Sequence, residues 1–156
     1  MGTYLNPGND GFRQILKGKY VDKTAMITLI NENIETPDKL VCVSRPRRFG
    51  KSFAAKMLCA YYDKSCDSRE LFDGLKVSED PSYLTYLNKM DVIYIDMTNI
   101  LGNVEPGDVV SFIKSQLTRE IRVAYPDVVD GDTLDQLLIN TVNCTGNKFK
   151  IGRAHV

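Results

Sequence analysis

The sequence lacks a net charge, because its 20 basic and 20 acidic residues cancel. Proteins dedicated to nucleic acids or membrane surfaces usually carry an excess of positive charge, so this balance argues against both classes. It leaves room for a local basic patch, and one occurs at Arg45, Arg47 and Arg48. The sequence also lacks any apolar run approaching the roughly 20 residues that a membrane helix needs. We therefore expect no membrane partner.

Residues that bind metals or form disulfides are also scarce. The four cysteines form no CxxC pair and have no histidine near them, so a zinc site has little support. We interpret them as reduced thiols of a cytosolic protein. The first residues, MGTYLNPG, have neither the basic start nor the apolar stretch of a signal peptide. These features favour a cytoplasmic location.

The last six residues, 151–156, read IGRAHV and resemble what a common sequencing-adapter oligonucleotide encodes in one reading frame. We predict that this tail is non-native and that residues 1–150 are the N-terminal part of a longer domain. The gene downstream of Lys150 would test this. Non-native segments are excluded from functional reasoning. Because the tail contains His155, the single histidine, mechanisms that need an imidazole lose their candidate.

The hydrophobic pattern predicts an α/β fold. Apolar residues at helical spacing predict helices over 24–34, 52–62, 108–125 and 133–142. Continuous apolar runs predict a strand buried on both faces at 40–43 and a second strand at 91–97. Residues 1–12 are expected to be irregular, and 71–86 to form short turns. Strands that alternate with long helices indicate a parallel sheet covered by helices.

Gly50-Lys51-Ser52 completes the phosphate-loop pattern G-x-x-x-x-G-K-[ST], and it stands between a predicted strand and a predicted helix. The glycine lets the backbone approach phosphate oxygens, and the amides that open the helix point at the anion. The lysine supplies a mobile positive charge, and the serine hydroxyl is a suitable Mg²⁺ ligand. The pattern departs from the standard form because Arg45 occupies its first glycine position and Pro46 restricts Arg45.

At this point the sequence resembles a known family. The segment SRPRRFGKS at 44–52, together with YVDKT at 20–24, closely resembles the bacterial AAA-ATPase-like family. In that family RPRRFGK[ST] replaces the standard Walker A sequence, so Arg45 is expected there. Many members carry a PD-(D/E)XK nuclease-like domain further along, which would make nucleic acid a partner of the parent protein. The resemblance implies a P-loop NTPase-type parallel sheet, with ATP and Mg²⁺ as cofactors.

The resemblance also places the family's Walker B strand directly after TGNKF at 145–149, where the predicted tail begins. The sheet is therefore expected to be incomplete, truncated before the Walker B acids. We expect the parent protein to be an ATPase and this chain not to hydrolyse ATP by itself. Asp96 ends an apolar strand, but the resemblance puts its counterpart one strand earlier, so we do not assign it as the Walker B acid.

The expected site follows from the loop. Lys51 and Arg48 are the predicted catalytic residues, and Ser52 is the predicted Mg²⁺ ligand. The residues expected to contact the nucleotide are Arg47, Phe49, Gly50, Lys51, Ser52 and Phe53.

Several alternatives stay open. Arg47 and Arg48 could stabilise transferring phosphate, contact a nucleic-acid backbone, or pair with acidic neighbours. Asp22 and Lys23 could approach the base or ribose, or simply form a helix cap and a solvated side chain. For the whole chain, the alternatives are a nucleic-acid-binding module that uses 45–48 and a degenerate phosphate loop kept as a protein-interaction scaffold.

Overall fold

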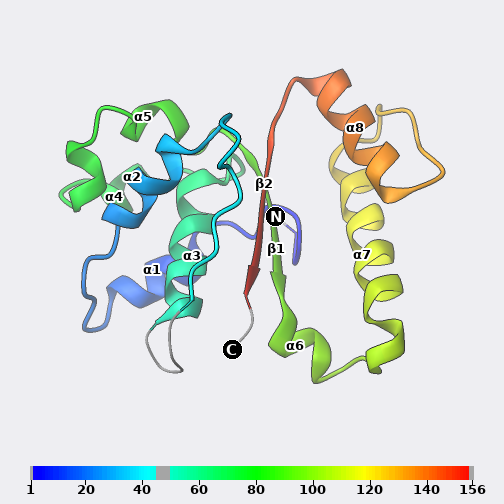
Figure 1. Ribbon diagram of the computed structural model, residues 1–156, viewed down its shortest axis with the longest axis horizontal. Coiled ribbons are helices and arrows are strands. Elements are labelled where there is room, and N and C mark those ends of the chain that lie inside the picture. The colour runs from blue at the N-terminus through cyan, green and yellow to red at the C-terminus, as the bar shows by residue number, and fades with distance from the viewer. Residues whose placement is uncertain (1, 45–49, 155–156) are drawn as a thin grey trace.

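The computed structural model describes residues 2–44 and 50–154. In this part of the chain two strands run between two groups of helices (Figure 1). The elements in chain order are α1 (Asp10–Leu16), α2 (Ala25–Glu32), α3 (Lys51–Tyr62), α4 (Arg69–Phe72), η1 (Lys76–Glu79), α5 (Tyr83–Tyr86), β1 (Asp91–Asp96), α6 (Met97–Leu101), η2 (Pro106–Asp108), α7 (Val109–Ala124), α8 (Leu134–Thr145) and β2 (Phe149–Ala154). Helices α1 to α5 lie on one side of the strands, and α7 and α8 lie on the other.

The sheet is parallel and centred on β1. Its partner β2 pairs in a register that runs from Asp91 opposite Phe149 to Asp96 opposite Ala154. The other edge of β1 is covered by the N-terminal segment, since Asn6 donates its backbone N–H to Val92 O (2.7 Å) and Tyr94 donates to Tyr4 O (2.8 Å). The α/β class with a parallel sheet is therefore confirmed for these two strands.

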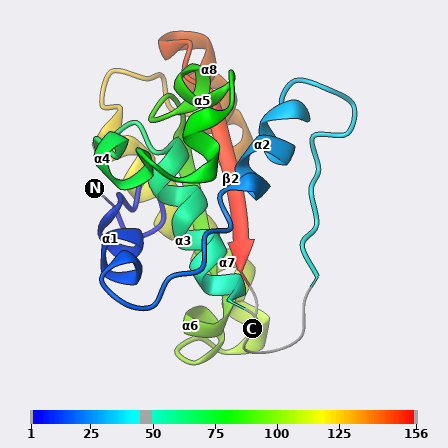
Figure 2. The same cartoon turned by 90° about the vertical axis from the view of Figure 1, so that its left-hand side faces the viewer.

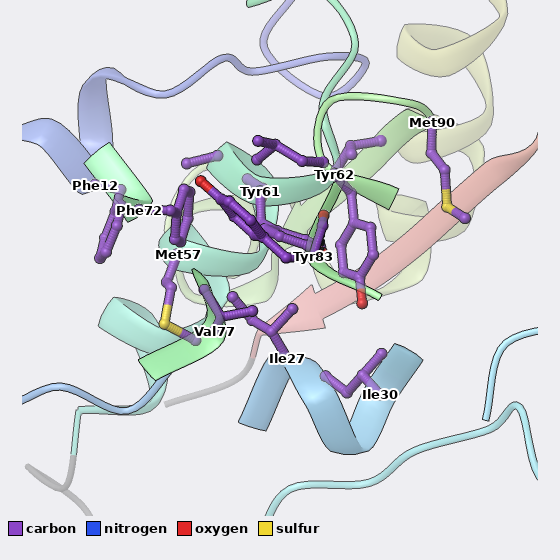
Figure 3. Packing of buried hydrophobic residues seen from close by; sticks show 14 residues of the cluster. Phe12, Ile27, Ile30, Met57, Tyr61, Tyr62, Phe72, Val77, Tyr83 and Met90 are labelled. Atoms are coloured by element: carbon purple, nitrogen blue, oxygen red, sulfur yellow. Dashed lines mark hydrogen bonds between the residues drawn. The ribbon is translucent and has the colours of Figure 1, made fainter. Parts of the chain in front are cut away.

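Two hydrophobic cores lie on opposite faces of β1, because successive side chains of a strand point to opposite sides. Val92 joins the core formed with α1 to α5, whereas Ile93 joins the core formed with α7 and α8. The first core is rich in aromatic side chains, among them Phe12, Tyr61 and Phe72 (Figure 3). It anchors the C-terminal half of α3, which fixes the direction in which the start of this helix points.

Most predicted elements are confirmed, namely α2, α3, α7, α8, β1 and the short turns between 69 and 86. The expectation of an irregular segment over 1–12 is partly wrong, because α1 begins at Asp10. This seven-residue helix buries Phe12 completely and packs against α3. So short a helix is marginal by itself, so the packing is what stabilises it.

The predicted buried strand at 40–43 is wrong. The structure assigns no strand to these residues, and 90% of the Leu40 side chain is exposed. Figure 2 shows the chain after α2 running at one side of the molecule, apart from β2. An apolar run becomes a strand only when a neighbouring backbone accepts and donates its ladder hydrogen bonds. Among the described backbone hydrogen bonds, none connects 40–43 to β1 or β2.

Residues 151–154 of the predicted tail form the last four of the six residues of β2. Strand pairing uses backbone groups that every non-proline residue carries, so it depends little on which side chains are present. The strand begins at Phe149, the last residue of TGNKF, and continues into the segment where the resemblance places the Walker B strand. No helix in residues 2–44 and 50–154 combines the length and apolar character needed to cross a membrane.

Candidate functional site

Helix α3 begins directly after Gly50, the last glycine of the predicted phosphate-loop pattern. Gly50 is the N-cap residue and adopts a left-handed conformation, with φ 77° and ψ 26°, which a residue with a side chain rarely adopts. Its carbonyl accepts the first helical hydrogen bond, from Ala54 N (2.9 Å). Helix α3 runs for 12 residues, so its aligned peptide dipoles favour negative charge at this end.

Three predicted site residues occupy the first turn of α3. Lys51 and Ser52 are half-buried, whereas Phe53 is 55% exposed. The amides of a first helical turn have no acceptor within their own helix, so they are oriented toward whatever lies before it. The predicted residues Arg47, Arg48 and Phe49 lie outside the described part of the chain, as does Arg45.

The YVDKT turn, residues 20–24, places a second lysine, Lys23, next to Gly50. A Cβ atom built on Gly50 would lie 3.0 Å from Nζ of Lys23. The neighbouring Asp22 accepts hydrogen bonds from Thr24 N (2.8 Å) and Thr24 Oγ1 (2.7 Å) through one oxygen, and from Lys76 N (2.9 Å) through the other. Thr24 is fully buried and occupies the N-cap position of α2, although its side chain makes no capping hydrogen bond. Asp22 therefore organises the turn that carries Lys23.

Asp22 should make the turn sensitive to acid. Partial burial raises its pKa, but the hydrogen bonds from Lys76 and Thr24 outweigh this and lower the pKa below its ordinary value. A lowered folded-state pKa means that the ionised form stabilises the fold above about pH 4 and that this contribution is lost at lower pH. We expect Asp22→Asn to cost about 1 kcal/mol of unfolding free energy at pH 7. Urea unfolding from pH 7 to pH 2.5 checks this, and a difference between the two proteins that did not shrink toward the acid end would contradict it.

An apolar groove of about 790 Å³ opens beside the start of α3. It is bounded by α2, α3, β2 and residues 39–43, and Lys51 is among its lining residues. On its rim, Lys148 forms an ion pair with Glu35. Within it, burial lowers the pKa of Lys150, whose Nζ lies 5.3 Å from the centre of the Tyr62 ring. The groove thus combines an apolar lining with several positive charges.

In the described part of the chain, acidic metal ligands do not gather near this site. Among residues 2–44 and 50–154, no cluster of three or more His, Cys, Asp or Glu side chains could hold a metal ion. Asp96 ends β1 and caps α6, accepting hydrogen bonds from Thr98 N (3.0 Å) and Asn99 N (3.3 Å). The fit to Mg²⁺ therefore rests on the hydroxyl of Ser52.

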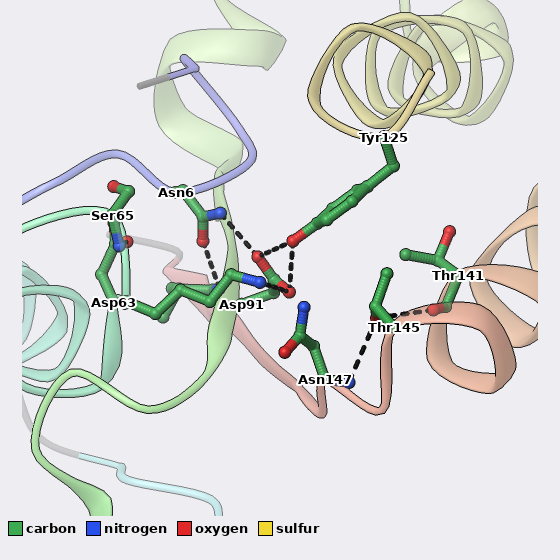
Figure 4. A network of polar contacts seen from close by, with 10 residues as sticks. Asn6, Asp63, Ser65, Asp91, Tyr125, Thr141, Thr145 and Asn147 are labelled. Carbon is green, nitrogen blue, oxygen red and sulfur yellow. Dashed lines mark hydrogen bonds and ion pairs between the residues drawn. The ribbon is translucent and has the colours of Figure 1, made fainter. Parts of the chain in front are cut away.

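A buried polar network surrounds Asp91, the first residue of β1. The Asp91 carboxylate is fully buried and accepts hydrogen bonds from Asn6 Nδ2 (2.7 Å) and from the Tyr125 hydroxyl (2.6 Å to each oxygen) (Figure 4). It also pairs with Lys64 Nζ at 2.9 Å. Burial lowers the pKa of Lys64, yet its bonds to Tyr125 and Asp91 leave it raised. The network joins the N-terminal segment, α7 and the chain after α3 to the start of β1.

The described residues therefore define an α/β protein in which a left-handed glycine opens a helix that begins with lysine and serine. The family model described as predicted AAA-ATPase matches residues 8–148. The chain belongs to this AAA-ATPase-like family, which confirms the family-level resemblance and supports ATP binding in general. No curated protein and no solved structure matches the chain.

The sequence predicted a site at Gly50, Lys51 and Ser52, and it left open whether Lys23 approaches the nucleotide or is a solvated side chain. Of the two roles left open for Asp22, the hydrogen bonds favour the structural one, because both of its oxygens accept hydrogen bonds from the protein. The sequence shows that Lys23 follows Asp22, a residue type that favours turns, but it does not show where this turn lies in the fold. The packing of the turn against α3 is what brings Lys23 next to Gly50.

Proposed function

We propose that this chain is the nucleotide-binding part of an ATPase and that the triphosphate of Mg-ATP is held at the start of α3. The observation that carries the proposal is the left-handed Gly50 followed by Lys51 and Ser52 at the first helical positions, in a chain of the predicted AAA-ATPase family. This arrangement offers backbone N–H groups, a helix dipole and an ammonium group to one anion. All three favour a highly charged phosphate over a neutral ligand.

Each residue has a distinct role in the proposal. The absence of a Cβ on Gly50 allows phosphate oxygens to approach the backbone, and Lys51 neutralises charge on the terminal phosphates. Ser52 offers its hydroxyl to Mg²⁺, and Phe53 contacts the nucleotide from the exposed side of the first turn. Arg47 and Phe49 complete the contacts, and Arg48 stabilises the charge that develops on the transferred phosphoryl group. Mg-ATP itself supplies the phosphoanhydride bond and the metal charge.

The decisive test is the response of the first turn of α3 to Mg-ATP. In a ¹H–¹⁵N NMR titration of the 156-residue chain, we expect the amide signals of Gly50 to Ser52 to shift, and Lys51→Ala to weaken binding at least about tenfold through the lost charge. Lys56→Ala is the matched control, because Lys56 is an exposed lysine on the same helix. NMR detects millimolar affinities, so weak binding is still measured. Unchanged signals from Gly50 to Ser52 in the unsubstituted chain would refute the proposal.

The same variants separate the alternative functions. A nucleic-acid-binding module that uses the basic cluster would lose only a small part of its salt-dependent affinity for an oligonucleotide when Lys51 becomes alanine. A degenerate loop kept as an interaction scaffold would be indifferent to the same substitution. The family match favours the nucleotide over both.

A further inference from the structure

We propose that Lys23 is a second cationic contact for the bound triphosphate and that it reaches the start of α3 from the YVDKT turn. This inference rests on the proposed function, because it concerns the same phosphate site. Its basis is the position of Lys23 Nζ, 3.0 Å from where a Cβ on Gly50 would lie. Lys23 Nζ therefore lies beside the glycine backbone, in the space that a side chain on Gly50 would need.

The turn that carries Lys23 is held to the protein on both sides. On one side, the Tyr20 hydroxyl lies 3.4 Å from Sδ of Met57, a buried residue of α3, and accepts a hydrogen bond from Lys23 N (3.3 Å). On the other side, Asp22 accepts from Lys76 N at 2.9 Å and Thr24 Oγ1 accepts from Val77 N at 3.1 Å. The backbone of the turn is therefore fixed relative to both α3 and η1.

This fixation matters for the energetics of binding. A lysine on a mobile loop loses conformational freedom when it engages a ligand, and that loss offsets much of the electrostatic gain. Here hydrogen bonds already position the backbone of the turn that carries Lys23, so this part of the loss is avoided. The carboxylate of the adjacent Asp22 is engaged by the amides of Thr24 and Lys76, so it is oriented toward the backbone of the turn and of η1.

Two lysines then flank one glycine. Lys51 follows Gly50 in the chain, and Lys23 approaches Gly50 through space. Two lysines at one glycine attract a ligand more strongly the more negative charge it carries. The pair should therefore discriminate among ligands by charge, with the strongest preference for ATP and for inorganic tripolyphosphate and none for adenosine.

The test compares ligands of different charge. In the NMR titration of the 156-residue chain, Lys23→Ala should weaken Mg-ATP and tripolyphosphate binding about tenfold and leave adenosine binding unchanged. Lys23→Arg, which keeps the charge, should stay within about threefold of the unsubstituted chain. Lys19→Ala is the matched control, since Lys19 is an exposed lysine just before the same turn. Thermal unfolding of each variant verifies that the fold is intact.

Each outcome has one meaning. If Lys51→Ala loses binding while Lys23→Ala behaves like Lys19→Ala, the inference about Lys23 is overturned and the proposed function stands. If Lys23→Ala weakens adenosine and Mg-ATP equally, Lys23 acts on the shape of the site, and the cationic contact is refuted. If the unsubstituted chain responds to neither Mg-ATP nor tripolyphosphate, both proposals fail together. Loss confined to the two polyphosphates, with recovery in Lys23→Arg, supports the inference.

Discussion

Replacing Asp91 with alanine should lower the free energy of unfolding by about 3 kcal/mol. The substitution removes a fully buried carboxylate and leaves the Tyr125 hydroxyl, Asn6 and Lys64 without the group that joins them. Buried polar groups that lose their partner cost the fold their full desolvation penalty. Lys64 is 26% exposed, so it can recover part of its hydration, which keeps the estimate at the lower end of the range for buried pairs. Urea unfolding followed by circular dichroism measures the loss.

Asp130 provides the matched control for this experiment. It also forms an ion pair, with Arg122 at 2.6 Å, but both side chains are more than half exposed. Exposed pairs contribute little, so Asp130→Ala should change the unfolding free energy by less than about 1 kcal/mol. Equal losses in Asp91→Ala and Asp130→Ala would show that burial and the joined hydrogen bonds are irrelevant here. Asp91→Asn should fall between them, because an amide oxygen can still accept the bond from Tyr125.

Replacing Phe72 with alanine should cost about 3–5 kcal/mol of unfolding free energy. The ring is 0% exposed and stacks on Phe12, with ring centres 5.0 Å apart and planes 21° from parallel. Its other contact is the ring of Tyr61, which meets it edge-on at 5.4 Å. Truncation removes these contacts and leaves a cavity that α1, α3 and α4 together enclose. Chemical denaturation of both proteins measures the change.

Phe53→Ala is the matched control, since it makes the same chemical change on the exposed side of α3. We expect it to alter stability by no more than about 0.5 kcal/mol. Phe72→Leu should cost less than Phe72→Ala, because the leucine side chain fills part of the space. An alanine variant at Phe72 as stable as the one at Phe53 would mean that the aromatic core is not what supports α3. Because α3 also carries Gly50 and Lys51, its support is relevant to the proposed phosphate site.

The sequence was most informative where an apolar pattern was long. The 16 residues of α7 and the six of β1 have clear periods, and both elements formed within a few residues of their predicted limits. It was least informative where tertiary partners decide the outcome. The run at 40–43 has the composition of a buried strand, but composition does not supply the neighbouring backbone that a strand needs. Helix α1 shows the converse, because packing on α3 makes a helix from a segment whose glycines predicted none.

In the candidate site, too, residues within a local sequence pattern could be predicted, whereas a residue placed by the tertiary fold could not. The pattern of Gly50, Lys51 and Ser52 carries its own context, a glycine that turns and a helix that follows, and the structure shows both at α3. Lys23 carries no such context, because its role depends on a fold that brings residue 23 to residue 50. The loop residues Arg47, Arg48 and Phe49 stay predictions, since they lie outside the described part of the chain.

The first hydrophobic core and the pairing of β1 with β2 become possible at different times during synthesis. The first core uses residues from Phe12 to Val92, whereas β1 and β2 pair Asp91 with Phe149, a separation of 58 residues (149 − 91). At about 5–20 residues per second, a ribosome needs roughly 3–12 s to make that interval. Collapse of a chain of this size takes less than about a millisecond. The aromatic core, and with it the turn and helix that meet at Gly50, can therefore assemble on the nascent chain while β1 still waits for its partner strand.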